Sequence, residues 1–561
     1  MLPGAKRQKG RRGCIYLSMD IPGVCLYADG PFWRFENSRS GSREHFAVRR
    51  QKNAASVWVR LQFDTPPMAL IAVPTMLIAL SFALVAAAVL WAHRVRSKLP
   101  LPPGPRPLTF IGNLFDMPKK HLAPALRELG EKYGELTYLN ILGQPMIILN
   151  SYEAAVGLLE SRSANTSDRP GVVMAELTGY MWVFAVLGYT QAWRTRRRLF
   201  HTFFQRSVIP EYRPVHSGQC RRFLHRLLTT PEDFMSLSRQ LFGETIMSVV
   251  YGIAIAEHDD PYVSLAEKAA HVFGKITIPG QYPVESLPFL RHIPSWFPGA
   301  GFKRDALRWS EVVSAARNMP YDAAMDAFAR GTAGPSVVTT MVENAVREHG
   351  DVSPQDDGCF RDIAGLAYLT GADTSVFSTQ AMFLAMVMYP DAQKKAQQEL
   401  DAVIGPDRLP EFSDRDSLPY INAVVKEIIR WHTVVPLGVS HRVMEEDEYK
   451  GYRIPAGTIL VPNAWAMSRD SEGPIKYQFG FGRRICPGRH FANDALFIVV
   501  ASVLHVFNIE PPLGPDGKPA HVAPDINLDS FLSYPEKFEC RITPRSAQAE
   551  ALIRRSVRGE F

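Results

Sequence analysis

A single cysteine in a glycine-rich loop, directly ahead of an apolar helix, restricts the fold of this chain more than any other feature. Cys486 follows the sequence FGFGRRI and precedes Pro487 and Gly488, and residues 487–507 have the apolar content of a buried helix. Glycines let the backbone turn tightly and approach a flat ligand. The positive end of a following helix favours the thiolate form of the cysteine. The loop therefore predicts a thiolate ligand for a haem iron, although an isolated cysteine is more often a small buried apolar residue.

Composition excludes several other classes of protein. Hydrophobic residues make up 46% of the 561 residues and charged residues 21%, which excludes disorder over most of the length and suits one large enzyme domain with additional segments. Six cysteines exclude a disulfide-rich scaffold and suit a reducing compartment. The formal net charge of +7 arises entirely within residues 1–67. We find no nucleic-acid-binding module, so no nucleic-acid partner is predicted.

An uncharged run of 25 residues, 68–92, predicts a transmembrane helix ahead of the main domain. As a helix it would extend about 37 Å, which exceeds the hydrocarbon core of a bilayer. A buried soluble helix and a cleaved signal peptide are the alternatives. Residues 93–114 combine a basic flank, which favours a cytoplasmic position for the main domain, with a proline-rich segment that predicts a stiff hinge.

The segments on either side of this anchor differ in character. Residues 1–67 are arginine-rich without sustained periodicity, and we interpret them as a basic extension that is disordered or a gene-model artefact. A targeting presequence is the alternative. Residues 115–545 show mainly helical periodicity with short strands, which predicts a mainly α domain with small β-sheets and excludes doubly wound and barrel architectures. Residues 546–561 form a C-terminal tail.

Further motifs occur in a fixed order along the chain. Trp193 and Arg197 have the spacing W-x-x-x-R, residues 370–375 read TGADTS, and Glu427 and Arg430 lie three positions apart. With the cysteine loop and the proline-rich hinge, these motifs resemble the cytochrome P450 superfamily over residues 68–545. The segment SWFPGAGFKR is similar to fungal microsomal members such as the O-methylsterigmatocystin oxidoreductases.

The resemblance implies roles for individual residues. Cys486 would bind the iron of haem b (iron protoporphyrin IX), while Asp373 and Thr374 would handle protons during dioxygen activation. A second membrane span around Asp373 is the alternative, but an acid within a membrane is costly. Glu427 and Arg430 would form a buried structural pair. Haem binding would also involve Trp193, Arg197, His441, Arg442, Phe479, Gly480, Gly482, Arg484 and Gly488.

The predicted function is that of a haem-thiolate monooxygenase, which inserts one oxygen atom of O2 into a hydrophobic small molecule in secondary metabolism or detoxification. Electrons would come from NADPH through cytochrome P450 reductase, with cytochrome b5 as a second candidate donor, because the sequence contains no dinucleotide-binding domain. The expected location is the endoplasmic reticulum membrane, with a single span and the catalytic domain facing the cytoplasm.

One segment of the family pattern is missing. Members carry a P-E-R-F-like motif, in a meander before the cysteine loop, whose arginine completes a triad with the Glu427 and Arg430 equivalents. Here only residues 471–478 separate NAWAMSRD from FGFGRRICPG. Either the gene model lacks an exon, or the chain is a non-catalytic or haem-deficient membrane-bound relic. A haem-thiolate isomerase or dehydratase is a further alternative.

Peptide mass spectrometry of the native protein tests the interpretation of the first segment. We expect no peptides from residues 1–67, because Met68 would open the protein directly on its predicted anchor. Recovery of such peptides from mature protein would contradict an artefactual extension.

Overall fold

The computed structural model describes residues 99–256, 260–278, 280–470 and 475–558, together with four short strands near the N-terminus and residues Ser81 and Leu84. The chain divides into two compact units, residues 1–96 and 97–561. The transmembrane helix predicted at 68–92 lies outside the described residues, except for Ser81 and Leu84, which are helical. Among the described residues, no helix has both the length and the apolar character needed to cross a bilayer.

The first unit contains a four-stranded antiparallel sheet with the order β1-β2-β3-β4. Its strands are β1 (Arg7–Lys9), β2 (Ile15–Ser18), β3 (Val24–Asp29) and β4 (Phe32–Asn37). The sequence pattern of residues 1–67 did not indicate these strands. Whether this segment belongs to the mature protein stays a prediction.

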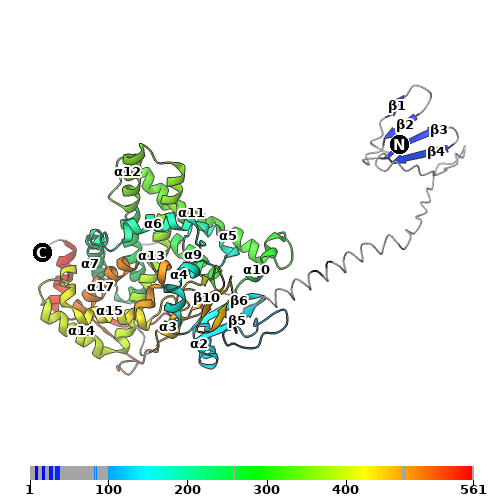
Figure 1. The fold of residues 1–561 in the computed structure, drawn as a ribbon. Helices are drawn as coiled ribbons and strands as arrows, with labels where there is room; N and C mark the ends of the chain where they lie inside the picture. The colour runs from blue at the N-terminus through cyan, green and yellow to red at the C-terminus, as the bar shows by residue number, and fades with distance from the viewer. Residues whose placement is uncertain are drawn as a thin grey trace. The chain divides into compact units, whose positions relative to one another are not determined.

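The second unit is mainly helical, which confirms the predicted fold class for this part of the chain (Figure 1). Its longer helices are α2 (Leu122–Tyr133), α6 (Gln191–Phe204), α7 (Arg213–Thr229), α8 (Phe234–Tyr251), α9 (Pro261–Thr277), α11 (Gly301–Ala329), α12 (Val337–His349), α13 (Pro354–Met388), α14 (Pro390–Val403), α15 (Pro419–Trp431), α17 (Arg489–Val506) and α18 (Ala547–Arg558). The shorter ones are α3 (Tyr152–Ala155), η1 (Val156–Glu160), α4 (Ser163–Thr166), α5 (Val173–Thr178), η2 (Tyr180–Trp182), η3 (Ile209–Tyr212), η4 (Pro231–Asp233), α10 (Pro283–Ser286), η5 (Pro288–His292), η6 (Phe412–Ser417), α16 (Ala464–Met467), η7 (Ile475–Phe479) and η8 (Gly482–Arg484).

Small sheets accompany the helices. The largest has the order β5-β6-β10-β7 and contains β5 (Leu136–Ile141), β6 (Gln144–Leu149), β10 (Ile459–Pro462) and β7 (His441–Arg442). Strand β10 is parallel to β6 and antiparallel to β7, and the β10–β7 pairing places Leu460 opposite His441. Two-stranded sheets are formed by β8 (Asp447–Tyr449) with β9 (Tyr452–Ile454), β11 (Phe507–Glu510) with β14 (Arg541–Pro544), and β12 (Ile526–Asn527) with β13 (Tyr534–Pro535).

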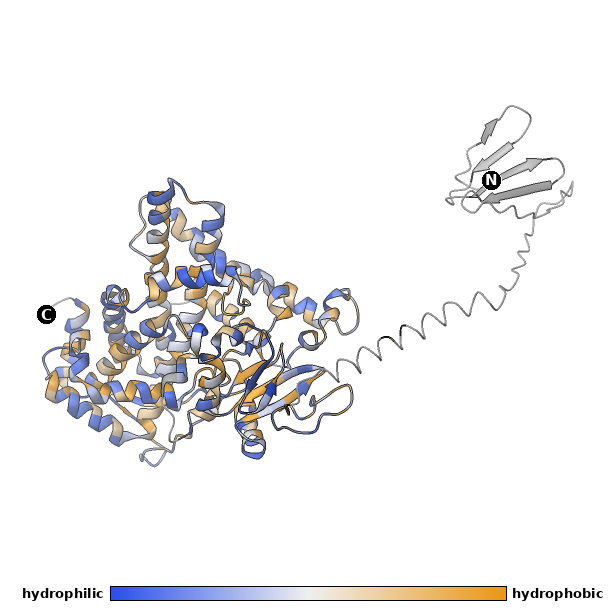
Figure 2. Cartoon of the chain, in the orientation of Figure 1, coloured by the Kyte–Doolittle hydropathy of each residue, from blue (hydrophilic) through white to orange (hydrophobic). Residues whose placement is uncertain are grey.

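Helix α13 forms the centre of the second unit. It begins where Ser353 accepts a hydrogen bond from the backbone N–H of Asp356, with Pro354 at the first helical position, a combination that favours a helix start. Most residues from Phe360 to Val387 are buried, as expected for a helix that is apolar on all sides, and it packs against α8, α11 and α17. Peripheral helices such as α14 carry hydrophilic residues along their length (Figure 2).

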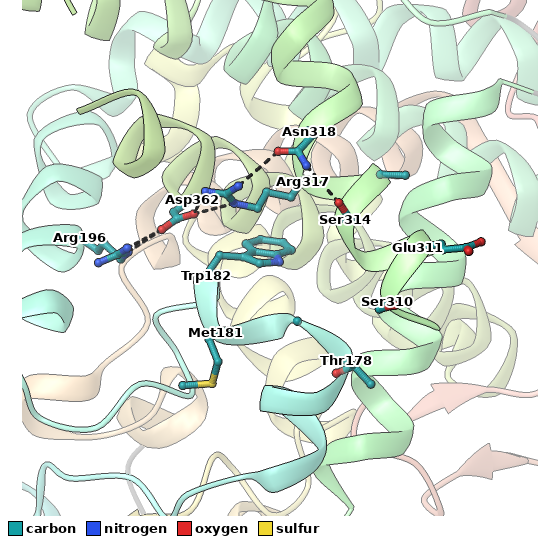
Figure 3. A pocket seen from close by; sticks show the side chains of 12 residues that line it. Thr178, Met181, Trp182, Arg196, Ser310, Glu311, Ser314, Arg317, Asn318 and Asp362 are labelled. Carbon is teal, nitrogen blue, oxygen red and sulfur yellow. Dashed lines mark hydrogen bonds and ion pairs between the residues drawn. The ribbon is translucent and has the colours of Figure 1, made fainter. Parts of the chain in front are cut away.

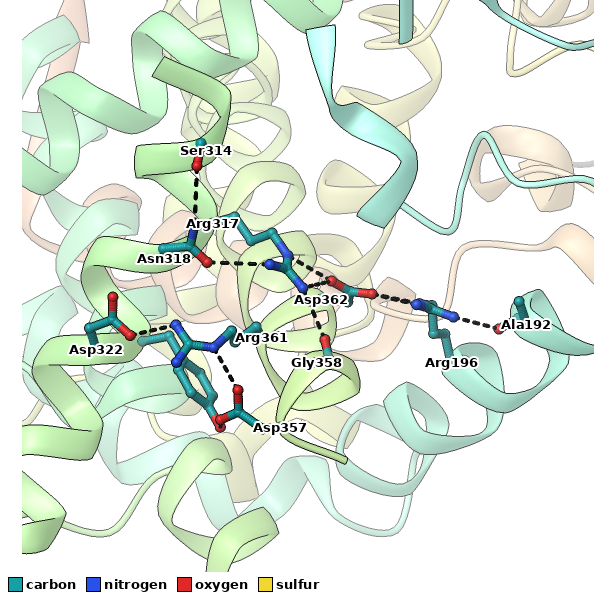
Figure 4. Close-up of polar contacts among 11 residues, drawn as sticks. Ala192, Arg196, Ser314, Arg317, Asn318, Asp322, Asp357, Gly358, Arg361 and Asp362 are labelled. Carbon is teal, nitrogen blue, oxygen red and sulfur yellow. Dashed lines mark hydrogen bonds and ion pairs between the residues drawn. The ribbon is translucent and has the colours of Figure 1, made fainter. Parts of the chain in front are cut away.

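A buried ion triad joins α13 to two other helices. The Asp362 carboxylate, almost fully buried, contacts Arg196 of α6 at 2.7 Å and Arg317 of α11 at 2.6 Å (Figure 3, Figure 4). Arg317 also donates to the carbonyl of Gly358. Because each oxygen of the carboxylate has its own arginine, the three helices are fixed relative to one another.

Asp362→Ala tests the contribution of this triad to stability. We expect a loss of about 3 kcal/mol in the free energy of unfolding, because two largely buried cations lose their counterion. Asp322→Ala is the matched control: Asp322 pairs with Arg361 at the surface, so its loss should cost at most about 1 kcal/mol. Urea unfolding followed by circular dichroism measures both variants, and equal losses would contradict the proposed difference.

Candidate functional site

The cysteine loop is held in a tight turn by its own backbone. The N–H of Cys486 donates to the carbonyl of Phe479 at 2.7 Å, and the N–H of Gly480 donates to the carbonyl of Tyr477 at 3.0 Å. Gly480 and Gly482 have φ angles of 80° and 52°, in the left-handed region that favours glycine. A Cβ atom on Gly482 would lie 2.3 Å from the carbonyl oxygen of Leu159. The loop thus packs its backbone against another part of the domain, as only glycine permits.

Two opposing effects act on the Cys486 thiol. Burial raises its pKa, while hydrogen bonds from the backbone N–H groups of Gly488 and Arg489, at the start of α17, lower it. The guanidinium of Arg197 also lowers the pKa of the thiol. The start of α17 therefore acts toward the thiolate, as expected, but for the polypeptide by itself burial is the larger effect. The charge of a bound metal ion would deprotonate the sulfur.

Buried cationic side chains gather next to this loop. Arg484 donates from Nε to the carbonyl of Ser167 and from Nη2 to the carbonyl of Leu187, both at 2.8 Å, and its guanidinium lies 4.2 Å from the ring centroid of the buried Trp193. Arg197, on the same helix as Trp193, donates to the carbonyl of Ile485.

Two more residues complete what we call the cation cluster, which consists of the arginines Arg169, Arg197 and Arg484 together with His441. Burial and the neighbouring arginines hold the pKa of His441 well below its usual value, so its ring is neutral. The ring Nδ1 of His441 is 2.8 Å from the carbonyl of Thr166. Nη1 of Arg169 donates to the carbonyls of Val439 and Ser440 at 2.7 Å. Sequence reasoning missed Arg169, because an arginine within SDRPG carries no spacing signal and only the fold brings it here.

The cluster carries more positive charge than its surroundings neutralise. Burial and the neighbouring cations lower the pKa of Arg484 and of Arg197 to about 10, and they hold the pKa of Arg169 well below its usual value. Asp168 acts in the opposite direction on Arg169 and Arg484. A ligand with two carboxylates beside Cys486 would relieve this repulsion, and the propionates of haem fit that requirement.

The other residues predicted to bind the cofactor lie in different positions. Phe479 is partly buried, and its carbonyl supports the loop. Gly488 immediately precedes α17. Arg442, predicted together with His441, is exposed and lies 3.8 Å from Asp168, so the structure does not bring it into the cation cluster. Neighbouring residues on a strand face opposite sides, which explains why His441 is buried and Arg442 is not.

A second group of charged residues surrounds Asp373 on α13. Its Oδ1 lies 3.6 Å from Nη1 of Arg239, and the same Nη1 is 3.4 Å from Oε1 of Glu267. Glu267 is exposed, so an ionic connection runs from the surface to Asp373. Thr374 donates its hydroxyl to the carbonyl of Thr370 at 3.1 Å. Arg239 and Glu267 were not predicted, because they lie on α8 and α9 and share no motif with Asp373.

Comparisons with known proteins agree with this arrangement. Residues 102–473 and 477–536 match the family model described as Cytochrome P450. The chain belongs to the cytochrome P450 family. The cytochrome P450 monooxygenase COX1 of Coprinopsis cinerea is 39% identical over 486 residues, which cover 82% of this chain and 94% of that protein.

Other fungal monooxygenases are similarly related to this P450. Cytochrome P450 monooxygenase 208 of Postia placenta is 38% identical over 83% of this chain and 94% of its own length. Tryptamine 4-monooxygenase of Psilocybe cyanescens is 36% identical over 82% of this chain and 95% of its own length. The chain is therefore a cytochrome P450 monooxygenase, an oxidoreductase that uses haem and O2.

The Glu427–Arg430 pair of this P450 differs from our expectation. Arg430 donates to both carboxylate oxygens of Glu427, at 2.7 and 2.6 Å, and also to the carbonyl of Ser468. The prediction of a buried pair was wrong, since 53% of the Glu427 side chain is exposed. Few residues remain to cover it, and the family match is interrupted at residues 474–476, inside the segment we found shortened. Water can solvate the exposed carboxylate, so losing a third partner costs less than in a buried pair.

Asp373→Asn tests the charge state of this P450's acid. Burial raises the pKa of Asp373 to about 6 from 3.8, so ionisation destabilises the fold. The wild type therefore loses stability as pH rises from about 4 to about 6, and the loss is complete above that range. We expect the variant to gain about 2 kcal/mol relative to the wild type between pH 4 and pH 8.

Urea unfolding at several pH values measures this difference. Asp391→Asn, which removes an exposed carboxylate on α14, is the control and should show no such trend. A difference for Asp373→Asn that stays constant with pH would contradict a raised pKa.

Proposed function

We propose that this cytochrome P450 monooxygenase inserts one atom of O2 into a hydrophobic small molecule in fungal secondary metabolism or detoxification, with haem b bound by Cys486. The observation that carries the proposal is the buried cation cluster beside the cysteine loop. Three arginines and the neutral His441 converge where the family pattern requires the porphyrin carboxylates, and the nearby Asp168 neutralises the arginines only in part.

The side chains around this cofactor have different roles in the proposal. Bound haem supplies the iron centre at which O2 is activated. Cys486 would provide the sulfur ligand, and Arg169, Arg197 and Arg484 would neutralise the propionates beside the ring of His441. Burial raises the pKa of Asp373 to about 6, so its carboxyl group can take up and release a proton close to neutral pH. Arg239 links that carboxylate to the exposed Glu267, which supports a route for protons from the surface.

Electrons come, in this proposal, from NADPH through cytochrome P450 reductase, with cytochrome b5 as a second candidate donor. The exposed side chains of Arg194 and Arg483 both lie against the ring of Tyr189, at 4.7 and 5.6 Å from its centroid. This places two cations beside the cysteine loop. A basic surface next to the haem supports docking of an acidic electron-transfer partner.

The proposed location is the endoplasmic reticulum membrane, with the catalytic domain facing the cytoplasm. The uncharged run 68–92 and its basic flank support a single anchor. Two segments of the catalytic domain expose large aromatic side chains: Phe110 is 94% exposed in the proline-rich hinge, and Trp296 is 77% exposed after η5. Exposed aromatic residues of this kind suit a membrane–water interface.

The substrate class rests on the relatives. The related Psilocybe protein is named a tryptamine 4-monooxygenase, so a chain of this type can act on a small aromatic molecule. We extend to this protein only the hydrophobic small-molecule class. The second candidate, a relic that does not hold haem, is favoured by the exposed Glu427 and the shortened segment beside it. An isomerase or dehydratase would not need the charged route to Asp373.

A ferrous carbon-monoxide spectrum of the expressed full-length protein distinguishes these functions. We expect the red-shifted band of a thiolate-bound haem in the wild type and its loss in Cys486→Ser. Absence of haem uptake by the wild type would support the relic. Consumption of NADPH after addition of reductase and a hydrophobic substrate separates the monooxygenase from an isomerase, which would consume none.

A further inference from the structure

A cleft of about 820 Å³ lies on the second unit away from the cysteine loop (Figure 3). The end of α5, the short helix η2 and one side of α11 form its walls, with Arg196 of α6 and Asp362 of α13 at one end. Its volume lies within the range of sites for small molecules. Arg196 and Arg197 are neighbours on α6 but have different contacts. Arg196 contacts Asp362 at the cleft, and Arg197 contacts the cysteine loop.

Trp182 presents an unused hydrogen-bond donor to this cleft. The residue is only 7% exposed, and its indole Nε1 has no hydrogen-bond partner among the described residues. Its ring packs on α13 at Gly365, where an added Cβ would lie 3.0 Å from Cζ3. Figure 3 shows the nitrogen edge of the ring turned toward the space between η2 and α11. A buried N–H group without an acceptor is rare, so a ligand oxygen is a fitting partner.

The facing wall on α11 provides a second donor. The hydroxyl oxygen of Ser314 accepts a hydrogen bond from the Asn318 side chain at 3.2 Å, which leaves the hydroxyl proton of Ser314 free to donate. Ser314 is exposed and lines the cleft, as Figure 3 shows. Trp182 and Ser314 are therefore both donors at this cleft, which favours a ligand with acceptor oxygens.

The charges at the end of the cleft have the matching sign. Arg196 and Arg317 share the single carboxylate of Asp362, which leaves one positive charge in excess. The carboxylate of Glu311 points away from the cleft in Figure 3. Met181 and Ala315 add apolar surface to the lining. Near the triad, the cleft thus combines two donors, a local positive charge and an apolar wall, whereas its lining as a whole, which includes Glu311, has no net charge.

We propose that this cleft binds a small monocarboxylate with an apolar body, at a site separate from the haem. One carboxylate oxygen accepts the hydrogen bond of the Trp182 indole, and the other accepts that of the Ser314 hydroxyl. The triad of Arg196, Asp362 and Arg317 holds the wall in place and supplies the favourable field. This site is independent of the proposed substrate and reaction, because none of its residues belongs to the cation cluster or to the charged group around Asp373.

Binding of 4-fluorobenzoate to the full-length holoenzyme tests the site, followed by fluorine NMR. An azole that ligates the iron is added first, so that the haem pocket is blocked and the haem absorption spectrum reports any displacement. We expect saturable binding that leaves the spectrum unchanged. Trp182→Phe, which keeps the ring and removes the donor, should weaken binding about tenfold, as should Ser314→Ala. Glu348→Gln, which removes an exposed carboxylate on α12 outside the cleft, is the matched control and should bind as the wild type does.

The charge requirement is tested with the methyl ester of the same acid, which keeps an acceptor and loses the charge. We expect the ester to bind several-fold more weakly than the acid. Equal binding of acid and ester would overturn the carboxylate assignment. Failure of the acid to saturate, displacement of the azole, or wild-type affinity in both Trp182→Phe and Ser314→Ala would overturn the site. The melting temperature and carbon-monoxide spectrum of each variant identify any loss of folding, and Ser314→Ala, at an exposed position, carries the test should Trp182→Phe misfold.

Discussion

The structure of the catalytic centre depends on positive charge buried beside one sulfur atom. Arg169, Arg197, His441 and Arg484 share a small volume, and their hydrogen bonds go mainly to neutral backbone carbonyl groups. Such bonds satisfy the donors but leave the charges of the three arginines repelling one another. Burial lowers the pKa values of these arginines most, and neighbouring cations lower them further. An anionic partner restores the balance. In the proposed function, cofactor and polypeptide form one electrostatic unit, because the porphyrin would supply the negative charge that the chain lacks.

Helix α13 organises the rest of the domain around this centre. Its buried surface explains its place between α8, α11 and α17, and its few polar residues mark the points where it does more than pack. Asp362 ties the helix to α6 and α11, while Asp373 connects it to α8 and, through Glu267, to α9. Since α6 carries both Arg196 and Arg197, the support of the central helix and the support of the cysteine loop share one rigid element.

The features that could be predicted from the sequence are those encoded by neighbours along the chain. The turn around Cys486 follows from its glycines, and the mainly helical class follows from periodicity. Arg169, Arg239 and Glu267 could not be found in this way, because tertiary packing alone brings them beside residues that are distant in the sequence. The burial of Glu427 was wrongly predicted for a related reason. The family pattern predicts the pairing of Glu427 with Arg430, but the exposure of Glu427 depends on the shortened segment before the cysteine loop. Most of the predictions for residues 1–98 concern positions outside the described residues and stay predictions.

The contacts of the cysteine loop also have a consequence for how the chain is made. Arg197 bonds to a carbonyl 288 residues further along, and Arg484 bonds to carbonyls about as far behind it. A ribosome adds residues at about 5–20 per second, so Arg169 and Arg197 emerge on the order of 15–60 s before the loop that they meet. During that interval the nascent domain contains Arg169 and Arg197 but not yet Cys486. With Cys486 as the proposed iron ligand, haem binding is therefore a late event of biosynthesis, and a chain released before Cys486 carries most of the helices but has no thiolate to hold iron.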